Sequence, residues 1–420
     1  MDRMIVRGGS RIEGSVQIWG AKNAALPQIA AALLSAERLE LGNVPDVSDI
    51  DTMLKLMEEL GVTAGRAPGH RLVLDAGGAR NGEAPYDIVR KMRASILVLA
   101  PLLARFGSAR VSQPGGCAIG ARPIDLHLKA LEALGAKVDR EAGYIHARVE
   151  GDGLRGGRIV LSSPSVGATE TALMATVLAH GESEILNAAR DPEVADLAAC
   201  LVAMGARIEG AGTHRILVQG VQALRHARHD LITDRIEAGT YAIAAAITGG
   251  HLEILGAHLE HLGSVGAALE SAGVQIWPTD RGLMVVRTGP LQAIDISTEP
   301  YPGFPTDLQA QFMALMTIAP GASVIRETVF ESRFMHVPEL GRLGANISLQ
   351  GSTALVRGVD HLHGAEVMAT DLRASVCLVL AALAAEGETT VHRIYHLDRG
   401  YERLDRKLVQ CGANIQRVAE

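Results

Sequence analysis

The chain has 420 residues, enough for two or three domains that each bury a large hydrophobic core. Charged residues make up 21% of it and hydrophobic residues 48%, a balance typical of globular proteins that excludes a disordered chain. Lys and Arg number 40 against 47 Asp and Glu, and the net charge is −7. This balance argues against a general nucleic-acid binder, although a local basic pocket stays possible.

Four cysteines, Cys117, Cys200, Cys377 and Cys411, are scattered along the chain without a CxxC pair. We therefore expect neither a zinc site nor a disulfide framework, and a reducing compartment fits best. The first residues lack the apolar run of a signal peptide, and no apolar stretch reaches the ~18 residues of a membrane span. These features predict a soluble cytoplasmic protein.

A short pattern recurs six times and divides the chain into periods of about 70 residues. Each copy places an apolar or small residue before a glycine and Ala or Val after it. The glycines are Gly61, Gly135, Gly205, Gly273, Gly344 and Gly412. We interpret each as the left-handed end of an amphipathic helix. Short apolar strands are expected to follow, at Val138, Ile208, Ile276, Ile347 and Ile415.

Each period also contains a second helix, rich in Ala, Leu, Val and Ile on nearly every face. Such a helix is buried. The expected ranges are 24–34, 94–103, 168–179, 238–248, 308–318 and 374–385. Three copies would form a domain with Ala-rich helices inside and strands and amphipathic helices around them. Small side chains let such helices approach closely, which accounts for an aromatic content of only 3%.

Polar residues gather at the N-terminal ends of these buried helices. The cations at four of the ends are Lys22, Arg93, Arg235 and Arg373. Helix capping is one interpretation, because Thr306 with Gln309 and Asp234 with Glu237 match the capping-box pattern. The other is a shared site for phosphate or carboxylate groups, since helix N-termini attract anions. The recurrence of polar groups at all six ends favours the shared site.

A glycine-rich loop at 113–126 contains Cys117, the residue with the most distinctive chemistry. The glycines predict a mobile loop with an accessible thiol, and the nearby Arg122 would lower its pKa. Cys117 could act as a nucleophile with a histidine base such as His127, or as a general acid. The spacing alone does not decide between these roles. The other three cysteines lie in apolar helices and are expected to be inert core residues.

Eight longer motifs give the chain a resemblance to a known family. They are Gly-Ala-Lys-Asn-Ala-Ala at 20–25, Met-Arg-Ala-Ser at 92–95, Pro-Gly-Gly-Cys-Ala-Ile-Gly-Ala-Arg-Pro at 114–123, Ser-Val-Gly-Ala-Thr at 165–169, Phe-Pro-Thr-Asp-Leu-Gln-Ala-Gln at 304–311, Phe-Glu-Ser-Arg-Phe-Met-His at 330–336, Ala-Thr-Asp-Leu-Arg-Ala-Ser at 369–375 and Asp-Arg-Gly-Tyr-Glu-Arg at 398–403. With them the chain resembles the UDP-N-acetylglucosamine 1-carboxyvinyltransferases from residue 1 to 420 without a large gap.

The resemblance implies transfer of the enolpyruvyl group of phosphoenolpyruvate to the 3-hydroxyl of UDP-N-acetylglucosamine, with release of phosphate. This is the first committed step of peptidoglycan precursor synthesis, and the family uses no metal or organic cofactor. Its fold is a two-domain inside-out α/β barrel built from six repeats. One domain would be 22–231, with the Cys117 loop as a lid that closes on the sugar. The other would join 1–21 to 232–420.

The same resemblance assigns roles to individual residues. Cys117 would protonate the methylene carbon of phosphoenolpyruvate, could carry a phosphoenolpyruvate adduct and would be the thiol that fosfomycin alkylates. Asp307 would take the proton from the sugar hydroxyl. The implied catalytic set is Cys117, Asp307, Lys22 and Arg399. The implied phosphoenolpyruvate clamp is Lys22, Asn23, Arg122, Arg373 and Arg399. The implied contacts to the UDP-sugar are Asn23, Arg93, Arg122, Pro123, Ile124, Asp125, Leu126, Ser163, Ser165, Val166, Gly167, Asp307, Val329 and Arg333.

One position departs from the family pattern. Ser163 stands where the family commonly has a Lys near the diphosphate of the sugar nucleotide. The loss of one exposed cation should weaken binding by ~1 kcal/mol or less. Two alternatives to the active transferase stay open: an enolpyruvyl transferase acting on shikimate 3-phosphate, and a non-catalytic paralogue that binds the UDP-sugar. The cysteine loop and the Phe-Pro-Thr-Asp motif argue against the first, and the intact catalytic set argues against the second.

Overall fold

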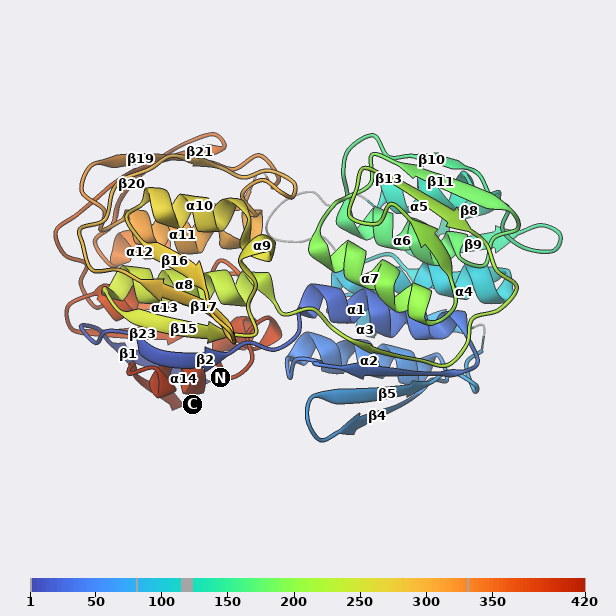
Figure 1. The fold of residues 1–420 in the computed structure, drawn as a ribbon, viewed down its shortest axis with the longest axis horizontal. Helices are drawn as coiled ribbons and strands as arrows, with labels where there is room; N and C mark the ends of the chain where they lie inside the picture. Colours follow the sequence, from blue (N-terminus) through green and yellow to red (C-terminus); the bar gives the residue numbers. More distant parts are fainter. Residues whose placement is uncertain (1, 81, 115–123, 331, 420) are drawn as a thin grey trace. The chain divides into compact units, whose positions relative to one another are not determined.

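The computed structural model describes residues 2–80, 82–114, 124–330 and 332–419, which form two compact units (Figure 1). Unit 1 contains the described residues of 2–19 and 233–419, and unit 2 contains those of 20–114 and 124–232. The sequence predicts domains at 22–231 and at 1–21 plus 232–420. A compact unit need not fold on its own, so these domain bounds stay a prediction. No helix in the described ranges is long and apolar enough to cross a membrane.

Unit 2 alternates helices with short strands. Its helices are α1 (Lys22–Ala31), η1 (Ala32–Leu34), α2 (Ser48–Glu59), α3 (Tyr86–Val89), η2 (Arg93–Val98), α4 (Leu99–Phe106), α5 (Asp125–Glu132), α6 (Val166–Thr176) and α7 (Pro192–Ala203). Its strands are β3 (Arg38–Gly42), β4 (Thr63–Ala67), β5 (Arg71–Asp75), β6 (Glu83–Ala84), β7 (Ser108–Ser112), β8 (Ala136–Glu141), β9 (Tyr144–Val149), β10 (Arg158–Val160), β11 (Glu182–Leu186), β12 (Arg207–Glu209), β13 (Arg215–Gln219) and β14 (Ala227–Asp230).

Unit 1 follows the same alternation. Its helices are α8 (Arg235–Thr248), α9 (Leu259–Leu262), α10 (Ser264–Ser271), η3 (Thr306–Leu308), α11 (Gln309–Met316), α12 (Val337–Arg342), α13 (Val376–Ala384), η4 (Ile394–Arg399) and α14 (Leu404–Gln410). Its strands are β1 (Arg3–Arg7), β2 (Glu13–Gln17), β15 (His251–Leu255), β16 (Gln275–Pro278), β17 (Gly282–Val286), β18 (Ile296–Ser297), β19 (Ala322–Arg326), β20 (Asn346–Gln350), β21 (Thr353–Arg357), β22 (Glu366–Met368), β23 (Glu388–His392) and β24 (Asn414–Val418).

The strands form four-stranded sheets, three in each unit, with the same internal plan. The orders are β14-β3-β5-β4, β6-β7-β9-β8 and β10-β11-β13-β12 in unit 2, and β16-β17-β15-β2, β18-β19-β21-β20 and β22-β23-β1-β24 in unit 1. Every sheet has one parallel pair and two antiparallel pairs, for example β10 with β11 and then β11 with β13 and β13 with β12. The sequence repeat therefore corresponds to a β-α-β-α-β-β unit with its own sheet.

Three of the six sheets join strands that are far apart in sequence, and in two of these the distant strands are the parallel pair; in the third, β1 pairs antiparallel with β23 and β24. In four sheets, a buried helix connects the parallel pair, as α6 connects β10 to β11. The exceptions are the parallel pairs β2 with β15 and β14 with β3. β2 precedes all of unit 2 along the chain, and β14 is the last strand of unit 2. The chain therefore passes between the units twice, once after residue 19 and once after residue 232.

The six recurring glycines mark helix ends as predicted. All six have positive φ angles, between 86° at Gly61 and 107° at Gly205. Each follows α2, α5, α7, α10, α12 or α14 within three residues and precedes a strand. Strands follow at all five predicted positions, as β8, β12, β16, β20 and β24, but the prediction that they are apolar is wrong. They lie at sheet edges, and most of their side chains are exposed or half-buried, because an edge strand has a neighbouring strand on one side only and its core-facing residues are covered only in part.

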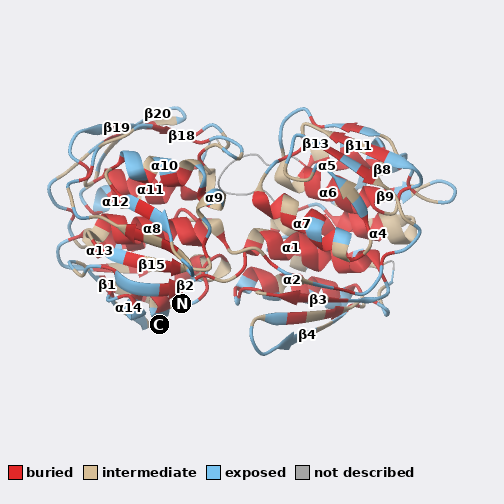
Figure 2. Ribbon diagram, viewed as in Figure 1, coloured by how far each residue is buried: buried red, intermediate tan, exposed pale blue. Residues whose placement is uncertain are grey.

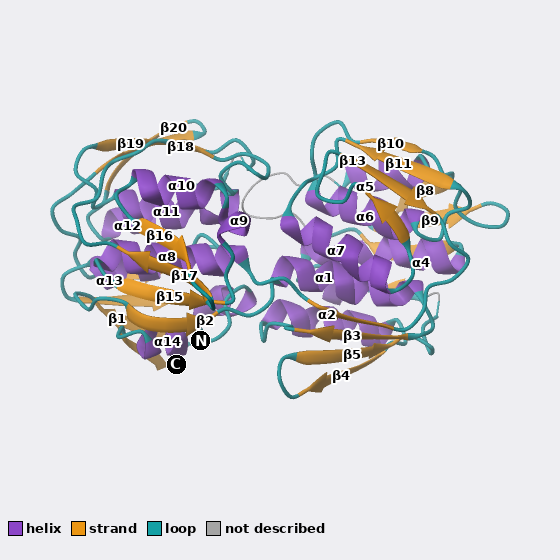
Figure 3. Cartoon of the chain, in the orientation of Figure 1, coloured by secondary structure: helices purple, strands orange, loops and turns teal. Residues whose placement is uncertain are grey.

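The predicted buried helices form the interior of each unit. Almost every residue of α1, α6, α8, α11 and α13 is buried, and the sheets lie outside them (Figures 2 and 3). Each unit has a separate hydrophobic core with Ala-rich helices at its centre. This arrangement of helices inside and strands outside confirms the predicted fold class. It also leaves the N-terminal ends of the buried helices as the places where polar groups enter the core.

Candidate active site

In unit 1, Asp234 and Arg373 form a buried ion pair at the start of α8. Asp234 is the N-cap residue, and its Oδ1 accepts hydrogen bonds from the backbone N–H groups of Ile236 and Glu237. Its Oδ2 lies 3.0 Å from Nη2 of Arg373. The side chains of the pair are 4% and 2% exposed. The carboxylate thus caps the helix and neutralises a fully buried guanidinium at once.

The surroundings of Arg373 fix its orientation. Nη1 donates to the Gly400 carbonyl at 2.9 Å, and the guanidinium lies 5.1 Å from the centre of the Tyr401 ring. Burial acts to lower the pKa of Arg373, but Asp234, Tyr401 and Asp307 together outweigh it and the pKa is raised. For Asp234, burial acts to raise the pKa, and the charge of Arg373 and the backbone hydrogen bonds lower it overall. Both side chains are therefore held in their charged forms.

Asp307 lies in η3, at the start of the next buried helix of unit 1. Its Oδ1 is 2.7 Å from Nη1 of Arg333, and its Oδ2 is 3.9 Å from Nε of Arg373. Within the described residues that Nε donates no hydrogen bond. Asp307 is 26% exposed, whereas Arg333 and Arg373 are almost fully buried. The structure thus brings three predicted site residues together, with the carboxylate as their accessible member.

The charge of Arg333 is firmly maintained. Burial acts to lower its pKa, but the carboxylates of Asp307, Asp371 and Glu327 together outweigh it, and the pKa is raised. A guanidinium beside Asp307 in turn favours the ionised carboxylate. An ionised carboxylate with an exposed edge can accept a proton from a hydroxyl group, which is the chemistry expected of Asp307.

The two predicted capping boxes have different outcomes. Asp234 caps α8 as expected, but the Glu237 side chain binds Lys407 at 2.8 Å instead of returning to the helix start. Burial raises the pKa of Glu237 to about 7 even with Lys407 beside it. The box at Thr306 is wrong. Pro305 occupies the N-cap position of η3, and the Thr306 hydroxyl donates to Glu327.

In unit 2, Lys22 and Asn23 are the first residues of α1. Lys22 is buried, and its Nζ lies 3.2 Å from Oδ2 of Asp49, whose side chain is 5% exposed. A buried cation at a helix N-terminus opposes the helix dipole, and Asp49 compensates for it. Asn23 is half-buried beside it.

The starts of α5 and α6 lie against each other in unit 2. Ser165 is the N-cap of α6, and its Oγ accepts from the Ala168 N–H at 3.4 Å. A Cβ on Gly167 would lie only 2.8 Å from Cε1 of His127, so a larger residue would collide with that ring. His127 Nδ1 bonds to Thr171 Oγ1 at 2.8 Å. The structure therefore places Ser165, Val166 and Gly167 next to α5, which begins at Asp125.

His127 is not suited to act as a base for Cys117. It is 6% exposed, and burial together with the charge of Arg93 lowers its pKa to about 4. A ring that is neutral at physiological pH and already bonded to Thr171 serves to pack α5 on α6. The same electrostatic effect shows that Arg93 lies near this ring. His127 is therefore unsuited to be the histidine base of the nucleophile alternative, and the role of Cys117 itself stays a prediction.

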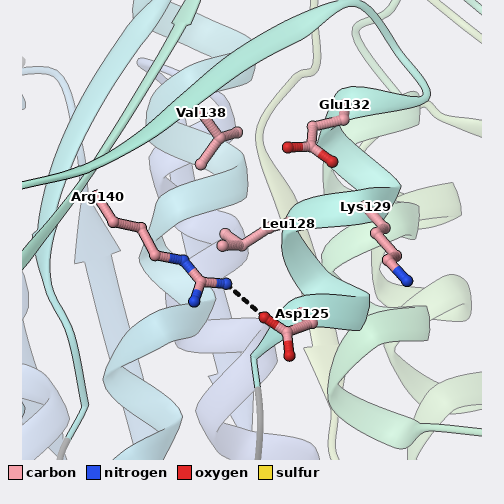
Figure 4. Close-up of a pocket in the computed structure, with 6 residues that line it drawn as sticks. All are labelled: Asp125, Leu128, Lys129, Glu132, Val138 and Arg140. Atoms are coloured by element: carbon pink, nitrogen blue, oxygen red, sulfur yellow. Dashed lines mark hydrogen bonds and ion pairs between the residues drawn. The ribbon is translucent and has the colours of Figure 1, made fainter.

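The remaining predicted residues are spread over exposed and half-buried positions. Ser163 is exposed, Leu126, Val329 and Arg399 are half-buried, and Ile124 is buried. Asp125 forms an ion pair with Arg140 at the rim of a shallow hollow of about 240 Å³ (Figure 4). That hollow is lined by Asp125, Leu128, Lys129, Glu132, Val138 and Arg140, and Asp125 is its single predicted site residue. Its lining mixes both charges, which is typical of a solvated surface.

Three predicted residues, Cys117, Arg122 and Pro123, lie outside the described residues. The other cysteines are buried, as expected of inert core residues. Burial raises the pKa of Cys200 and of Cys377, and it raises that of Cys411 to about 11. None of these three thiols is ionised at neutral pH, so their low reactivity is confirmed.

Comparison with known proteins places this chain in a family. The family model of EPSP synthase (3-phosphoshikimate 1-carboxyvinyltransferase) matches residues 6–408. A UDP-N-acetylglucosamine 1-carboxyvinyltransferase 2 of Mesorhizobium japonicum is 68% identical over the full length of both chains. The UDP-N-acetylglucosamine 1-carboxyvinyltransferase of Gluconacetobacter diazotrophicus is 60% identical, again over 100% of each chain. The chain belongs to the UDP-N-acetylglucosamine 1-carboxyvinyltransferase family.

Solved structures agree with an enolpyruvyl-transferase fold. The enolpyruvyl transferase NikO from Streptomyces tendae is 28% identical, with a TM-score of 0.89 over 99% of both chains. An EPSP synthase from Acinetobacter baumannii is 16% identical, with a TM-score of 0.75 over 100% of both chains, and this likeness shows the fold alone. The family predicted from the eight motifs is confirmed, and so is its enolpyruvyl-transferase fold.

The family motifs did not predict the residues that hold the predicted site residues in place. They are Asp49 beside Lys22, Asp234 as the partner of Arg373, and Glu327 behind Thr306 and Arg333. Asp234 had a usable signal, because a capping carboxylate one residue before a buried helix enters the core. For Glu327 the sequence contains no such signal. The order of the strands in the sheet decides which residues it contacts, and this order cannot be read from the spacing of the residues along the chain.

Proposed function

We propose that this chain transfers the enolpyruvyl group of phosphoenolpyruvate to the 3-hydroxyl of UDP-N-acetylglucosamine and releases phosphate. The observation that carries the proposal is the 68% identity, over the whole chain, to a relative named for that reaction. The described geometry supports it, because Asp307 offers an accessible carboxylate held by two arginines. The scattered cysteines fit an enzyme that works in the cytoplasm, in the first committed step of peptidoglycan synthesis.

The proposed reaction has two balanced steps. In the addition, the sugar oxygen bonds to C2 of phosphoenolpyruvate, its proton passes to Asp307, and Cys117 gives a proton to the methylene carbon. The product is a tetrahedral phospholactoyl ketal. In the elimination, the methyl carbon gives up a proton to the enzyme, the C–C double bond forms again and phosphate leaves, and the proton on Asp307 is released so that Cys117 and Asp307 regain their starting protonation states. All atoms come from the two substrates, and no cofactor is required.

The proposal assigns the cations to the charged parts of the substrates. Lys22, Arg122, Arg373 and Arg399 would bind the phosphate and carboxylate of phosphoenolpyruvate. Asn23, Arg93 and the turn at Ser165 would bind the sugar nucleotide, and a helix N-terminus suits its diphosphate. Such fixed charges position the substrates and stabilise the charge that develops during the addition.

A second candidate function follows from the family model, whose description names 3-phosphoshikimate. An enzyme acting on shikimate 3-phosphate would share the fold and the phosphoenolpyruvate chemistry. The relatives at 55–68% identity are named for the UDP-sugar, whereas the structures named EPSP synthase are 16–17% identical. We therefore favour the UDP-sugar as acceptor.

The deciding experiment measures phosphate release by the purified chain. Phosphoenolpyruvate is supplied with UDP-N-acetylglucosamine, with shikimate 3-phosphate, or alone, and the sugar product is checked by mass spectrometry. We expect release of phosphate and formation of an enolpyruvyl product only in the reaction that contains both phosphoenolpyruvate and UDP-N-acetylglucosamine. Release with shikimate 3-phosphate instead would support the second candidate. Binding of the UDP-sugar without any phosphate release would identify a non-catalytic paralogue.

The role proposed for Cys117 has its own test. A Cys117→Asp variant keeps an acidic proton donor but removes the thiol that an epoxide alkylates. We expect it to retain measurable phosphate release and to resist fosfomycin. Continued inactivation of the variant by fosfomycin would show that the drug reacts elsewhere. Complete loss of turnover would point to a nucleophilic thiol in place of a proton donor.

A further inference from the structure

Glu327 is a fully buried carboxylate in unit 1 that the proposed reaction does not use. It follows β19 directly, is 1% exposed, and its backbone N–H is bonded to the Ser352 carbonyl at 2.8 Å. Four donors converge on its side chain: the hydroxyls of Thr298 and Thr306 and the backbone N–H groups of Val329 and Phe330. Burying an ionised carboxylate is costly, so four hydrogen bonds on one side chain mark a built arrangement.

One branch of this arrangement leads to the proposed base. The Thr306 hydroxyl donates to Glu327 Oε2 at 2.9 Å. The oxygen of that hydroxyl accepts from Nη1 of Arg333 at 3.0 Å. The same Nη1 lies 2.7 Å from Oδ1 of Asp307. Asp307 therefore contacts an arginine that also contacts Thr306, and Thr306 in turn contacts Glu327.

The other branch leads to a residue expected to contact the sugar nucleotide. Glu327 Oε1 accepts from the backbone N–H groups of Val329 and Phe330 at 2.8 and 3.0 Å. The Phe330 carbonyl accepts from the Arg333 N–H at 3.2 Å, and the guanidinium of Arg333 lies 5.5 Å from the centre of the Phe330 ring. The backbone at Val329 and the side chain of Arg333 are thus held by the same carboxylate.

We infer that Glu327 is a positioning residue, which sets the direction of the Thr306 hydroxyl and thereby holds Arg333 against Asp307 while fixing the backbone at Val329. This inference rests on the proposed function, in which Asp307 accepts the proton of the sugar hydroxyl. It adds a residue outside the eight sequence motifs to the machinery of that reaction.

The physical reason lies in the single proton of a hydroxyl group. A threonine hydroxyl has one donor and two lone pairs, whereas a guanidinium is a donor only. With its proton committed to Glu327, Thr306 presents a lone pair to Arg333. If Glu327 were neutralised, the hydroxyl proton could turn toward the cation, and the contact to Arg333 would weaken. The carboxylate therefore acts on Asp307 through two intervening side chains.

The experiment compares three threonine variants of the full-length chain. Thr306→Val removes the hydroxyl that links Glu327 to Arg333, and Thr306→Ser keeps it. Thr298→Val is the matched control, because it removes a hydrogen bond of 2.8 Å to Oε1 of the same carboxylate and leaves the bond from Thr306 to Oε2 in place. Each variant is measured for kcat and KM, for the pH dependence of kcat and for its denaturation midpoint.

Thr306→Val should lower kcat about tenfold, the usual effect of losing one hydrogen bond to a charged group. The acidic limb of its kcat profile should move to higher pH, because Asp307 without a firmly held cation takes up a proton more readily. Thr306→Ser should restore kcat to within about twofold of the parent chain, and Thr298→Val should stay within about twofold while losing similar stability. Glu327→Gln should resemble Thr306→Val, since an amide N–H aimed at Thr306 reverses that bond.

Two results would overturn the inference. Equal losses of kcat in Thr306→Val and Thr298→Val would mean that the carboxylate has a structural role only. An unchanged kcat and pH profile in Thr306→Val would mean that no relay exists. If the parent chain itself fails to release phosphate, the proposed function is wrong, and crystal structures of Thr306→Val and Thr306→Ser then decide the inference. The distance from Arg333 to Asp307 should increase in the valine variant alone.

Discussion

The two units share one architecture but hold charge differently at the ends of their buried helices. In unit 1, carboxylates start the helices and bind buried arginines, as in Asp234 with Arg373 and Asp307 with Arg333. In unit 2, the helix starts hold Lys22 paired with Asp49, and Ser165 beside the neutral ring of His127. The repeated scaffold sets where polar groups can enter a core, and each unit fills those places with its own chemistry.

This difference has a physical origin in the scaffold. The left-handed glycines and the Ala-rich helices recur in all six periods because every period needs the same turn and the same close packing. The helix N-termini carry no such requirement, since any side chain that satisfies the free N–H groups or balances the charge is tolerated there. Functional variation therefore collects at the helix starts, and substitutions there should separate the roles of the two units.

The largest expected effect is on turnover, from Asp307→Asn in unit 1. The amide can still accept from Arg333 but is far less basic, and losing a general base costs roughly 10²- to 10⁴-fold in kcat. The counterpart in unit 2 is Asp49→Asn, which loosens Lys22. It should raise KM for phosphoenolpyruvate more than it lowers kcat. Steady-state kinetics of both variants make the comparison, and a KM effect of Asp307→Asn with normal kcat would contradict the role proposed for Asp307.

The next effect is on stability, from Asp234→Ala. Arg373 would stay buried without its charged partner, which typically costs about 3–5 kcal/mol. Asp234→Asn keeps an oxygen for the N–H groups of α8 and removes only the charge, so it separates the cap from the ion pair. The surface pair of Arg7 and Glu388 in the same unit supplies the control, because Glu388→Ala should cost about 1 kcal/mol or less. Urea denaturation measures all three, and equal losses for Asp234→Ala and Glu388→Ala would be inconsistent with the buried pair.

The third effect is a pH dependence from two buried histidines. Burial and the charge of an arginine lower the pKa of His127 to about 4 and that of His336 to about 3, against 6.5 for a free ring. The unfolded chain therefore takes up these protons first. The stability that each neutral ring contributes is complete above pH 6.5 and is lost as the pH falls toward the folded value. Between pH 7.5 and 5.0 each ring should account for about 2 kcal/mol.

Replacing the rings should show how the two units differ in this respect. Neither ring nitrogen of His336 forms a hydrogen bond within the described residues, whereas His127 bonds to Thr171. His336→Leu should thus change the free energy of unfolding little at pH 7.5 and should reduce the stability that is lost between pH 7.5 and 5.0. His127→Leu should also reduce the stability lost between pH 7.5 and 5.0. It should in addition lower the free energy of unfolding at pH 7.5, because Thr171 loses its hydrogen-bond partner. Urea unfolding at both pH values tests this, with the exposed His214→Gln as control. If the free energy of unfolding changes with pH in both Leu variants as it does in the parent chain, other groups are responsible for the pH dependence.

The sequence was sufficient to predict the repeated parts of the fold. Six evenly spaced glycines identify six helix ends, and an Ala-rich composition identifies the buried helices, because both follow from local requirements. The exposure of the strands after the glycines was predicted wrongly. Ile347 and Ile415 look like core residues in sequence, but β20 and β24 are edge strands that expose most of their side chains. Sheet order, which decides this, arises from long-range pairing.

The candidate site was predictable where motifs are contiguous. The motifs that contain Asp307, Arg333 and Arg373 gave these residues together, and the structure brings them into contact. Their supports were not predictable. Glu327 reaches Thr306 across 21 positions, and Asp234 reaches Arg373 across 139, so only the folded sheets and helices bring them together. Side-chain networks of this kind depend on topology and leave no periodic trace in the sequence.

The smallest expected effect concerns Ser163, where the family commonly has a lysine. Ser163 is exposed and lies two residues before the N-cap of α6. Ser163→Lys should lower KM for UDP-N-acetylglucosamine by less than about fivefold, since an exposed charge contact contributes ~1 kcal/mol or less. The effect should vanish in about 1 M salt, where screening is nearly complete. The neighbouring Ser162→Lys adds the same charge one position away. If it lowers KM equally, the change reflects the general field of unit 2, and if Ser163→Lys alone does so, the diphosphate is bound at the start of α6.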